Sequence, residues 1–175
     1  MVLLLAACLS RYLDAPYVLS TGLDQPVQLD AGPGERLVVT TATGALQIDG
    51  TGKATAASAT PERRRPTRPG ARLETRITEG LAWVDAAGAL RVEERLLLDT
   101  LEAPRALGHD ARDRLYVVAG ADEPRLYRLE GERLVLIADF VGPVVDMAWG
   151  PGGALPERML YLVREDGILE YLEPS

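Results

Sequence analysis

The chain has 175 residues, of which 47% are apolar and 26% are charged, a balance that fits one globular domain and excludes wholesale disorder. The 26 acidic residues outnumber the 19 basic ones and give a net charge of −7, so a global basic field for nucleic acid is excluded. The single Cys and single His exclude a disulfide framework and a zinc site built from Cys and His. Asparagine is absent and Lys53 is the only lysine, which suggests a GC-rich source and is compatible with a thermophile.

Residues 2–7 form an apolar run that is too short to span a bilayer, and Cys8 follows it directly. The sequence LAAC that ends at Cys8 resembles the lipobox of bacterial lipoproteins, although no basic residue precedes the run. An upstream start codon would explain that departure. We therefore expect residues 1–14 to be a signal-like leader and tether, with Cys8 lipidated. The protein would then be an extracytoplasmic, membrane-anchored lipoprotein of the periplasm or cell surface. The alternative is a short apolar strand with a buried cysteine.

From residue 15 onward, short apolar runs bounded by Gly, Pro and Asp predict β-strands. No window carries a 3.6-residue apolar stripe long enough for a good helix. The expected strands are residues 15–21, 27–30, 36–41, 45–49, 73–77, 80–85, 89–93, 95–101, 105–109, 114–119, 125–130, 133–140, 144–148, 158–163 and 168–172.

A repeat of about 39 residues organises these strands. An apolar residue followed by two variable residues and Pro recurs as LDQP, LEAP and FVGP, which end at Pro26, Pro104 and Pro143, and a degenerate copy ends at Pro69. We predict an all-β fold: a small β-propeller-like array of about four four-stranded blades within residues 15–175. The expected blades cover approximately residues 23–65, 66–101, 102–140 and 141–175.

The last unit has only three strands, so we expect the N-terminal strand at 15–21 to complete it and close the ring. Three alternatives stay open. They are a β-sandwich or meander, a fragment of a larger propeller, and half of a ring that a second copy completes. The aromatic residues that recur on the strands are interpreted as packing between blades.

The strand sequences RLYVV (114–118) and MLYLV (159–163), each preceded by a turn, resemble the NHL and gluconolactonase-like propeller superfamily. The resemblance rests on short apolar patterns over residues 23–175 and implies architecture rather than function. Its enzymes hold a divalent metal with Glu, Asn and Asp. Because this sequence has no asparagine, those Asn ligands cannot be matched, which counts against the enzymatic branch.

Residues 53–72 have the composition of a long exposed loop, part of which is a candidate outer strand for the first blade. Five arginines lie in ten residues of it, and they are candidates for binding a phosphate, a lipid headgroup or an acidic partner. The alternative is a solvated loop. The candidate anion-binding residues are Arg63, Arg64, Arg65, Arg68 and Arg72.

Polar residues on the expected inner strands would meet at the mouth of the central channel. The candidates are Asp30, Glu74, Arg76, His109, Asp110 and Asp146. Converging carboxylates could hold Ca²⁺ or Mg²⁺ through oxygen ligands. The alternative is ordinary turn residues, since Asp110 occupies a turn position of the repeat. His109 is the only histidine for acid–base work, and no nucleophile elbow exists.

We therefore interpret the chain as a non-catalytic binding or scaffolding module of the bacterial cell envelope. Its expected partners are a protein or glycan and, through the lipid anchor, the membrane, with no nucleic acid. No catalytic residue and no cofactor is predicted. The alternative is a metal-dependent, lactonase-like hydrolase of small molecules that uses the carboxylates at the channel mouth.

Overall fold

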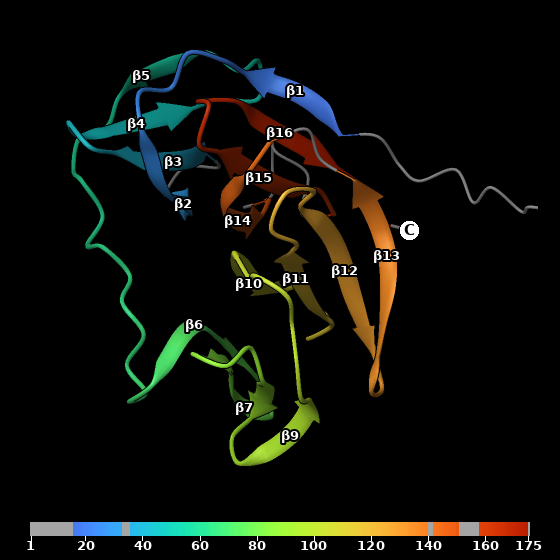
Figure 1. The fold of residues 1–175 in the computed structure, drawn as a ribbon. Helices are drawn as coiled ribbons and strands as arrows, with labels where there is room; N and C mark the ends of the chain where they lie inside the picture. The colour runs from blue at the N-terminus through green and yellow to red at the C-terminus, as the bar shows by residue number, and fades with distance from the viewer. Residues whose placement is uncertain (1–15, 33–35, 140–141, 151–157, 175) are drawn as a thin grey trace, which may run out of the picture.

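The computed structural model describes residues 16–32, 36–139, 142–150 and 158–174. All regular elements in these ranges are β-strands, and the ranges contain no helix that is long and apolar enough to cross a membrane. The strands form four antiparallel sheets of four strands each, arranged as the blades of a β-propeller (Figure 1). The predicted fold class is confirmed. The leader with Cys8 lies outside the described residues, so its lipidation stays a prediction.

In blades 1 to 3 the four strands follow one another in chain order from the channel outward, whereas the outermost strand of blade 4 is the N-terminal strand. Blade 1 consists of β2 (Pro26–Gly32), β3 (Arg36–Thr41), β4 (Ala45–Ile48) and β5 (Ala54–Ala56). Blade 2 consists of β6 (Ala71–Ile77), β7 (Gly80–Asp85), β8 (Leu90–Val92) and β9 (Arg95–Leu98). Blade 3 consists of β10 (Ala106–His109), β11 (Leu115–Ala119), β12 (Arg125–Glu130) and β13 (Arg133–Asp139). Blade 4 consists of β14 (Val144–Trp149), β15 (Leu160–Arg164), β16 (Leu169–Leu172) and β1 (Tyr17–Ser20).

The N-terminal strand completes the last blade, as the strand count predicts. β1 pairs antiparallel with β16, with Tyr17 opposite Tyr171 and their ring centroids 5.6 Å apart. The N-terminal and C-terminal ends of the described chain therefore share one sheet. The outer edge of β16 is paired rather than left open, which removes an aggregation-prone edge at this position.

Three apolar cores hold neighbouring blades together, one at each of three junctions. Leu29, Leu37 and Val39 of blade 1 pack against blade 4. A second core joins blades 4 and 3 around Leu162, and a third joins blades 3 and 2 around Leu90. Because side chains alternate across a strand, the apolar residues of each sheet face the adjoining blade.

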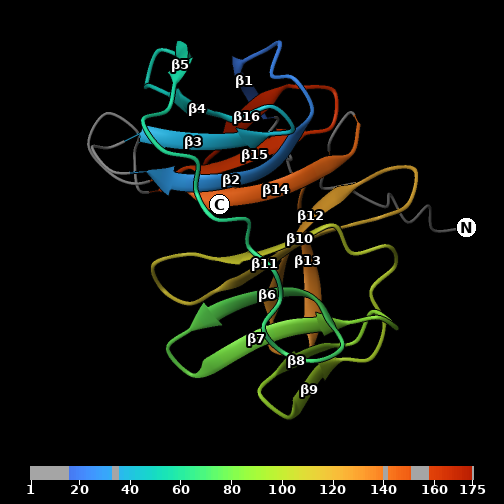
Figure 2. The same ribbon diagram turned by 90° about the vertical axis from the view of Figure 1, so that its left-hand side faces the viewer.

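The fourth junction, between blades 1 and 2, is built differently. The inner strands pack in the order β2, β14, β10 and β6, and no comparable packing joins β6 back to β2 among the described residues. The segment of residues 57–70, the strap, connects β5 to β6 and runs across this opening (Figures 1 and 2). The array is thus closed at three junctions and open at one, the seam.

The repeated Pro motif is a turn that ties one blade to the previous one. Its third residue adopts a positive φ in each clear copy, at Gln25 (45°), Ala103 (42°) and Gly142 (94°). In two copies the buried apolar first residue donates its backbone N–H to a turn glycine of the preceding blade. Leu23 reaches the Gly167 carbonyl at 3.1 Å, and Leu101 reaches the Gly88 carbonyl at 2.8 Å. The motif therefore fixes the junctions between blades 4 and 1 and between blades 2 and 3.

This role predicts that Gly167→Ala will destabilise the protein more than Gly131→Ala. Both glycines have a positive φ (79° and 62°), so both substitutions carry a similar backbone strain of about 1 kcal/mol. A Cβ at Gly167 would lie 2.2 Å from the Leu23 carbonyl oxygen, whereas one at Gly131 meets nothing within 4 Å. We expect an additional loss of about 1–3 kcal/mol at Gly167, measured by urea unfolding. Equal losses would contradict the tight contact at this junction.

Candidate functional site

The walls of the seam are polar, whereas the walls of the three closed junctions are apolar. On β2, Leu29 faces blade 4 while Gln28 and Asp30 face the seam. On β6, Ile77 belongs to the core shared with blade 3, while Glu74 and Arg76 are on the opposite face. The alternation of polar and apolar residues along the inner strands of blades 1 and 2 therefore places polar side chains at the open junction.

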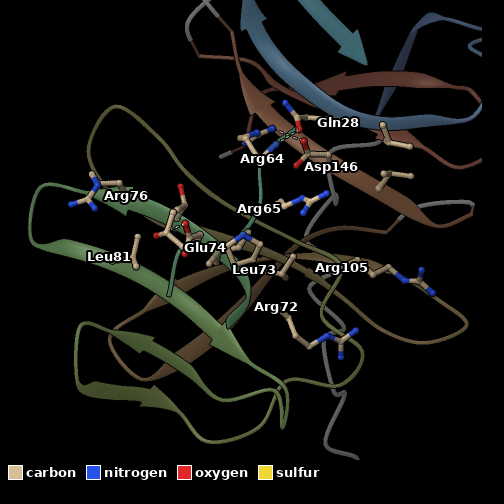
Figure 3. Close-up of a pocket in the computed structure, with 16 residues that line it drawn as sticks. Gln28, Arg64, Arg65, Arg72, Leu73, Glu74, Arg76, Leu81, Arg105 and Asp146 are labelled. Carbon is tan, nitrogen blue, oxygen red and sulfur yellow. Dashed lines mark hydrogen bonds and ion pairs between the residues drawn. The ribbon is translucent and has the colours of Figure 1, made fainter. Parts of the chain in front are cut away.

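A cavity of about 530 Å³ occupies the seam and continues into the central channel. Its size falls within the range of ligand pockets. Its lining combines aliphatic side chains with five arginines and two carboxylates. The lining residues are Val27, Gln28, Arg64, Arg65, Pro66, Thr67, Arg72, Leu73, Glu74, Thr75, Arg76, Leu81, Arg105, Leu107, Val145 and Asp146. Figure 3 shows this pocket with the strap crossing it.

The inner strands supply lining residues through a repeated irregularity. The strand register shifts at Val27 in β2, at Arg72 in β6 and at Val145 in β14, and each of these residues lines the cavity. Arg105, just before β10, lies at the corresponding place in blade 3. A β-bulge re-aims a side chain, and bulges often occur beside functional sites. Sequence reasoning missed Val27, Arg105 and Val145, although their position close behind a motif Pro is a readable signal.

One end of the strap is anchored to blades 1 and 4 by Arg64. Its guanidinium lies 3.2 Å from Asp30, pairs with Asp146 and donates to the Leu29 carbonyl at 2.6 Å (Figure 3). The buried Gln28 accepts from the Arg64 backbone N–H at 2.7 Å and donates to Asp30 at 2.7 Å. The predicted residues Asp30, Arg64 and Asp146 thus meet in one cluster, to which sequence reasoning did not assign Gln28.

The carboxylate of Asp146 is partly buried in this cluster. Burial raises its pKa above the ordinary value of 3.8, while Arg64 and the backbone N–H groups of Leu29 and Met147 oppose that rise. The Leu29 N–H donates to Asp146 Oδ2 at 2.8 Å, which ties β2 of blade 1 to β14 of blade 4. Arg64 is therefore the countercharge that permits an ionised carboxylate at this position.

Arg64→Met should therefore destabilise the protein near neutral pH by about 1–2 kcal/mol, a modest cost because Arg64 is 53% exposed and solvent screens the pair. The pKa of Asp146 rises further without Arg64. An ionised Asp146 with a raised pKa opposes folding, and this penalty disappears as the pH falls through that pKa. The stability gap between variant and wild type should therefore narrow in acid, as measured by urea unfolding at several pH values. Arg63→Met is the control, and a gap that widens in acid would contradict the assignment.

The other end of the strap is anchored to blade 2. Glu74 accepts from Thr67 Oγ1 at 3.0 Å and from the Arg68 backbone N–H at 3.2 Å. The Arg68 guanidinium pairs with Glu94, lies 3.7 Å from Glu93 and stacks 4.5 Å from the centre of the Trp83 ring. Trp83 therefore packs under an arginine at the seam instead of between two apolar blade faces.

The remaining channel candidates lie apart from the Arg64 cluster. His109 Nδ1 is 2.9 Å from Thr75 Oγ1, across the junction of blades 2 and 3. The buried Asp110 accepts from the backbone N–H groups of Arg112 and Arg114 and from the Arg114 side chain, and so shapes the β10–β11 turn. Burial raises the pKa of Asp110, but these hydrogen bonds outweigh it and leave the pKa below its usual value. Asp110 thus has the turn role that its position in the repeat suggests.

Three lining arginines keep their charge uncompensated. Arg65, on the strap, and Arg72 and Arg76, on β6, are exposed and have no hydrogen-bond or ion-pair partner among the described residues. Arg105 donates to the carbonyls of Gly120 and Ala121, which leaves its positive charge in place. Arg63 is exposed and lies outside the lining. The predicted arginine cluster thus divides into the strap anchors Arg64 and Arg68 and the free charges around the cavity.

The described residues contain no group of three or more His, Cys, Asp or Glu side chains that could hold a metal ion. Among the six candidates for the channel mouth, only Asp30 and Asp146 share a common partner, which is Arg64. The hydrolase alternative is therefore left without a described cluster that favours it.

No protein-family model matches the sequence, and no curated protein matches it. Among solved structures, the chain is similar to two crystal structures of BBS1N in complex with ARL6DN, one soaked with mercury and one with lead. The identities are 18% and 15%, the TM-scores are 0.43 and 0.39, and the matches cover 80% and 84% of this chain. They cover 47% of each of those chains, so this chain spans about half their length. The resemblance to NHL and gluconolactonase-like propellers stays an interpretation of strand patterns.

Proposed function

We propose that the protein is a non-catalytic binding module that holds an anionic partner in the seam cavity. The observation that carries this proposal is the set of uncompensated guanidinium groups of Arg65, Arg72 and Arg76 around an open cavity with an aliphatic floor. Arginine offers planar, multiple hydrogen-bond donors that suit carboxylate and phosphate oxygens.

The net charge of −7 does not oppose this function at short range. At physiological ionic strength the Debye length is about 8 Å, so charges farther away are largely screened. Inside the cavity the nearest charges are five arginines against Glu74 and Asp146. Asp146 is already paired with Arg64, and Glu74 is occupied by the strap. A bound anion would therefore meet a locally positive site on an acidic protein.

Isothermal titration calorimetry with tripolyphosphate and with poly-L-glutamate tests this function. The wild type should bind at least one of these anions, with an affinity that falls as salt is added. The triple variant Arg65→Ser, Arg72→Ser, Arg76→Ser should lose most of that affinity. The matched control replaces Arg112, Arg133 and Arg158, which are exposed and lie outside the cavity lining, with serine. Equal losses in both triple variants would overturn the assignment to the seam.

We also propose, from the sequence alone, that Cys8 carries a lipid anchor and that the partner is a protein or glycan of the bacterial cell envelope. Mass spectrometry of the membrane fraction tests the anchor. Acylated Cys8 at the mature N-terminus is the expected result, and Cys8→Ser should move the protein to the soluble fraction. Unmodified Cys8 in a soluble cytoplasmic protein would contradict the proposal.

A further inference from the structure

The free arginines on the wall of the seam are spread along the cavity (Figure 3). Arg72 and Arg76 are four residues apart on β6, which corresponds to about 10–13 Å along a strand that carries a bulge at Arg72. They lie toward opposite ends of the cavity, with Arg65 between them on the strap side (Figure 3). The carboxylate of Glu74 lies midway along the same strand. A compact anion drawn to the midpoint would meet this like charge.

The ligand that fits such a wall carries negative charge at two separated points and none between them. In an extended peptide, residues i and i+4 point to the same side and are about 13 Å apart. Acidic residues at i and i+4 would face Arg72 and Arg76, and a neutral residue at i+2 would face Glu74. The residues at i+1 and i+3 would then point away from β6, toward the aliphatic side chains of Val27 on β2 and Val145 on β14, which also line the cavity.

The cavity extends from the strap to residues of all four inner strands, among them Val27, Leu107 and Val145. β2 and β6 are the innermost strands of their sheets, and neither has a strand neighbour on its channel side. No aromatic side chain lines the cavity, so the stacking surfaces that single-stranded nucleic acids use are missing from the lining. These features favour a peptide over a nucleic acid.

We infer that the seam binds an extended acidic segment of a protein partner, with the pattern acidic, apolar, neutral, apolar, acidic lying along β6. This inference rests on the proposed anion-binding function and names the class of its partner. The segment enters through the opening between blades 1 and 2, beneath the strap. Its two carboxylates pair with Arg72 and Arg76.

Calorimetry with defined peptides tests the pattern on the full chain. The peptide acetyl-GGEVSVEGG-amide should bind more tightly than acetyl-GGEEVSVGG-amide, which has the same composition with adjacent acidic residues. Arg72→Gln and Arg76→Gln should each weaken the first peptide by about threefold, the effect of one partly exposed ion pair. Arg112→Gln is the control and should change nothing.

Glu74 supplies a second and independent test. The peptide acetyl-GGEVEVEGG-amide places a third acidic residue opposite Glu74, so the wild type should bind it less well than its charge suggests. Glu74→Gln should tighten binding of this peptide by about threefold or more, and by a larger factor than it tightens binding of acetyl-GGEVSVEGG-amide. The amide still accepts a hydrogen bond from the strap.

The outcomes separate this inference from the proposed function. Equal binding of the two isomeric peptides would overturn the pattern and leave general anion binding standing. The same conclusion would follow if tripolyphosphate bound in an arginine-dependent way and no peptide bound. If no anion binds in a way that depends on Arg65, Arg72 and Arg76, both proposals fail.

Discussion

Replacing Leu90 with alanine is expected to cost about 2–5 kcal/mol of unfolding free energy, whereas the same change at Leu81 should cost about 1 kcal/mol. Both leucines belong to blade 2. Leu90 is completely buried in the core that joins blades 2 and 3, so its truncation leaves a cavity between two packed sheets. Leu81 faces the seam and lines an open cavity that water already reaches. Urea unfolding of the two variants measures the difference.

Leu162→Ala offers a control at another closed junction, because Leu162 is fully buried between blades 3 and 4. It should behave like Leu90→Ala. If Leu81→Ala proved as costly as the other two, the seam would be packed like a closed junction. The distinction between three apolar junctions and one polar one would then be wrong.

Cutting the strap with trypsin is expected to leave the propeller assembled. The strap has no strand pairing at Arg63 and Arg64, and the Arg63 side chain is exposed and lies outside the Arg64 anchor, which suits proteolysis at Arg63. The Arg65–Pro66 and Arg68–Pro69 bonds are poor trypsin sites because Pro follows Arg. One fragment keeps blade 1 with β1, and the other keeps blades 2 and 3 with the rest of blade 4. The pairing of β1 with β16 and the core between blades 1 and 4 should hold the fragments together.

Gel filtration of the cut protein, followed by denaturing electrophoresis, should therefore show two fragments that co-elute at the volume of the intact chain. Their thermal midpoint should now depend on concentration, because the two parts have become separate molecules. Leu29→Ala, which weakens the core between blades 1 and 4, should promote dissociation after the cut. If the wild-type fragments separated at micromolar concentration, the result would contradict the pairing of β1 with β16 and the packing of blade 1 against blade 4.

The blades could be predicted from sequence because the information is local. Runs such as residues 80–85 and 125–130 begin and end where β7 and β12 do, since apolar runs between turn residues define strands. The third residue of the Pro motif could not be predicted to have a positive φ, because Gln25 and Ala103 rarely adopt it. Only the tertiary contact of that turn with the preceding blade explains this conformation.

The candidate site was predictable only as a list of residues. Regular spacing suggested a closed ring with carboxylates around its axis, whereas Asp30 and Asp146 converge on Arg64. That grouping depends on where the strap crosses the seam, and no local pattern encodes the crossing. A signal was nevertheless present in the sequence. The inner strands of blades 1 and 2 carry polar residues on the side that faces the seam, whereas the blade faces that meet at the closed junctions are apolar. The bulges that turn Arg72 into the cavity needed the strand register.

An acidic partner that binds at the open seam between blades 1 and 2 should shift the NMR signals of the residues around that seam. The most direct test is a ¹⁵N-labelled NMR titration with acetyl-GGEVSVEGG-amide. Shifted amides should cluster in the second half of the strap, along β6 and around Val27 and Val145. The amides of the three closed junctions should stay in place. Shifts confined to the outer strands β5, β9, β13 or β1, with the amides of the seam unchanged, would contradict binding at the seam.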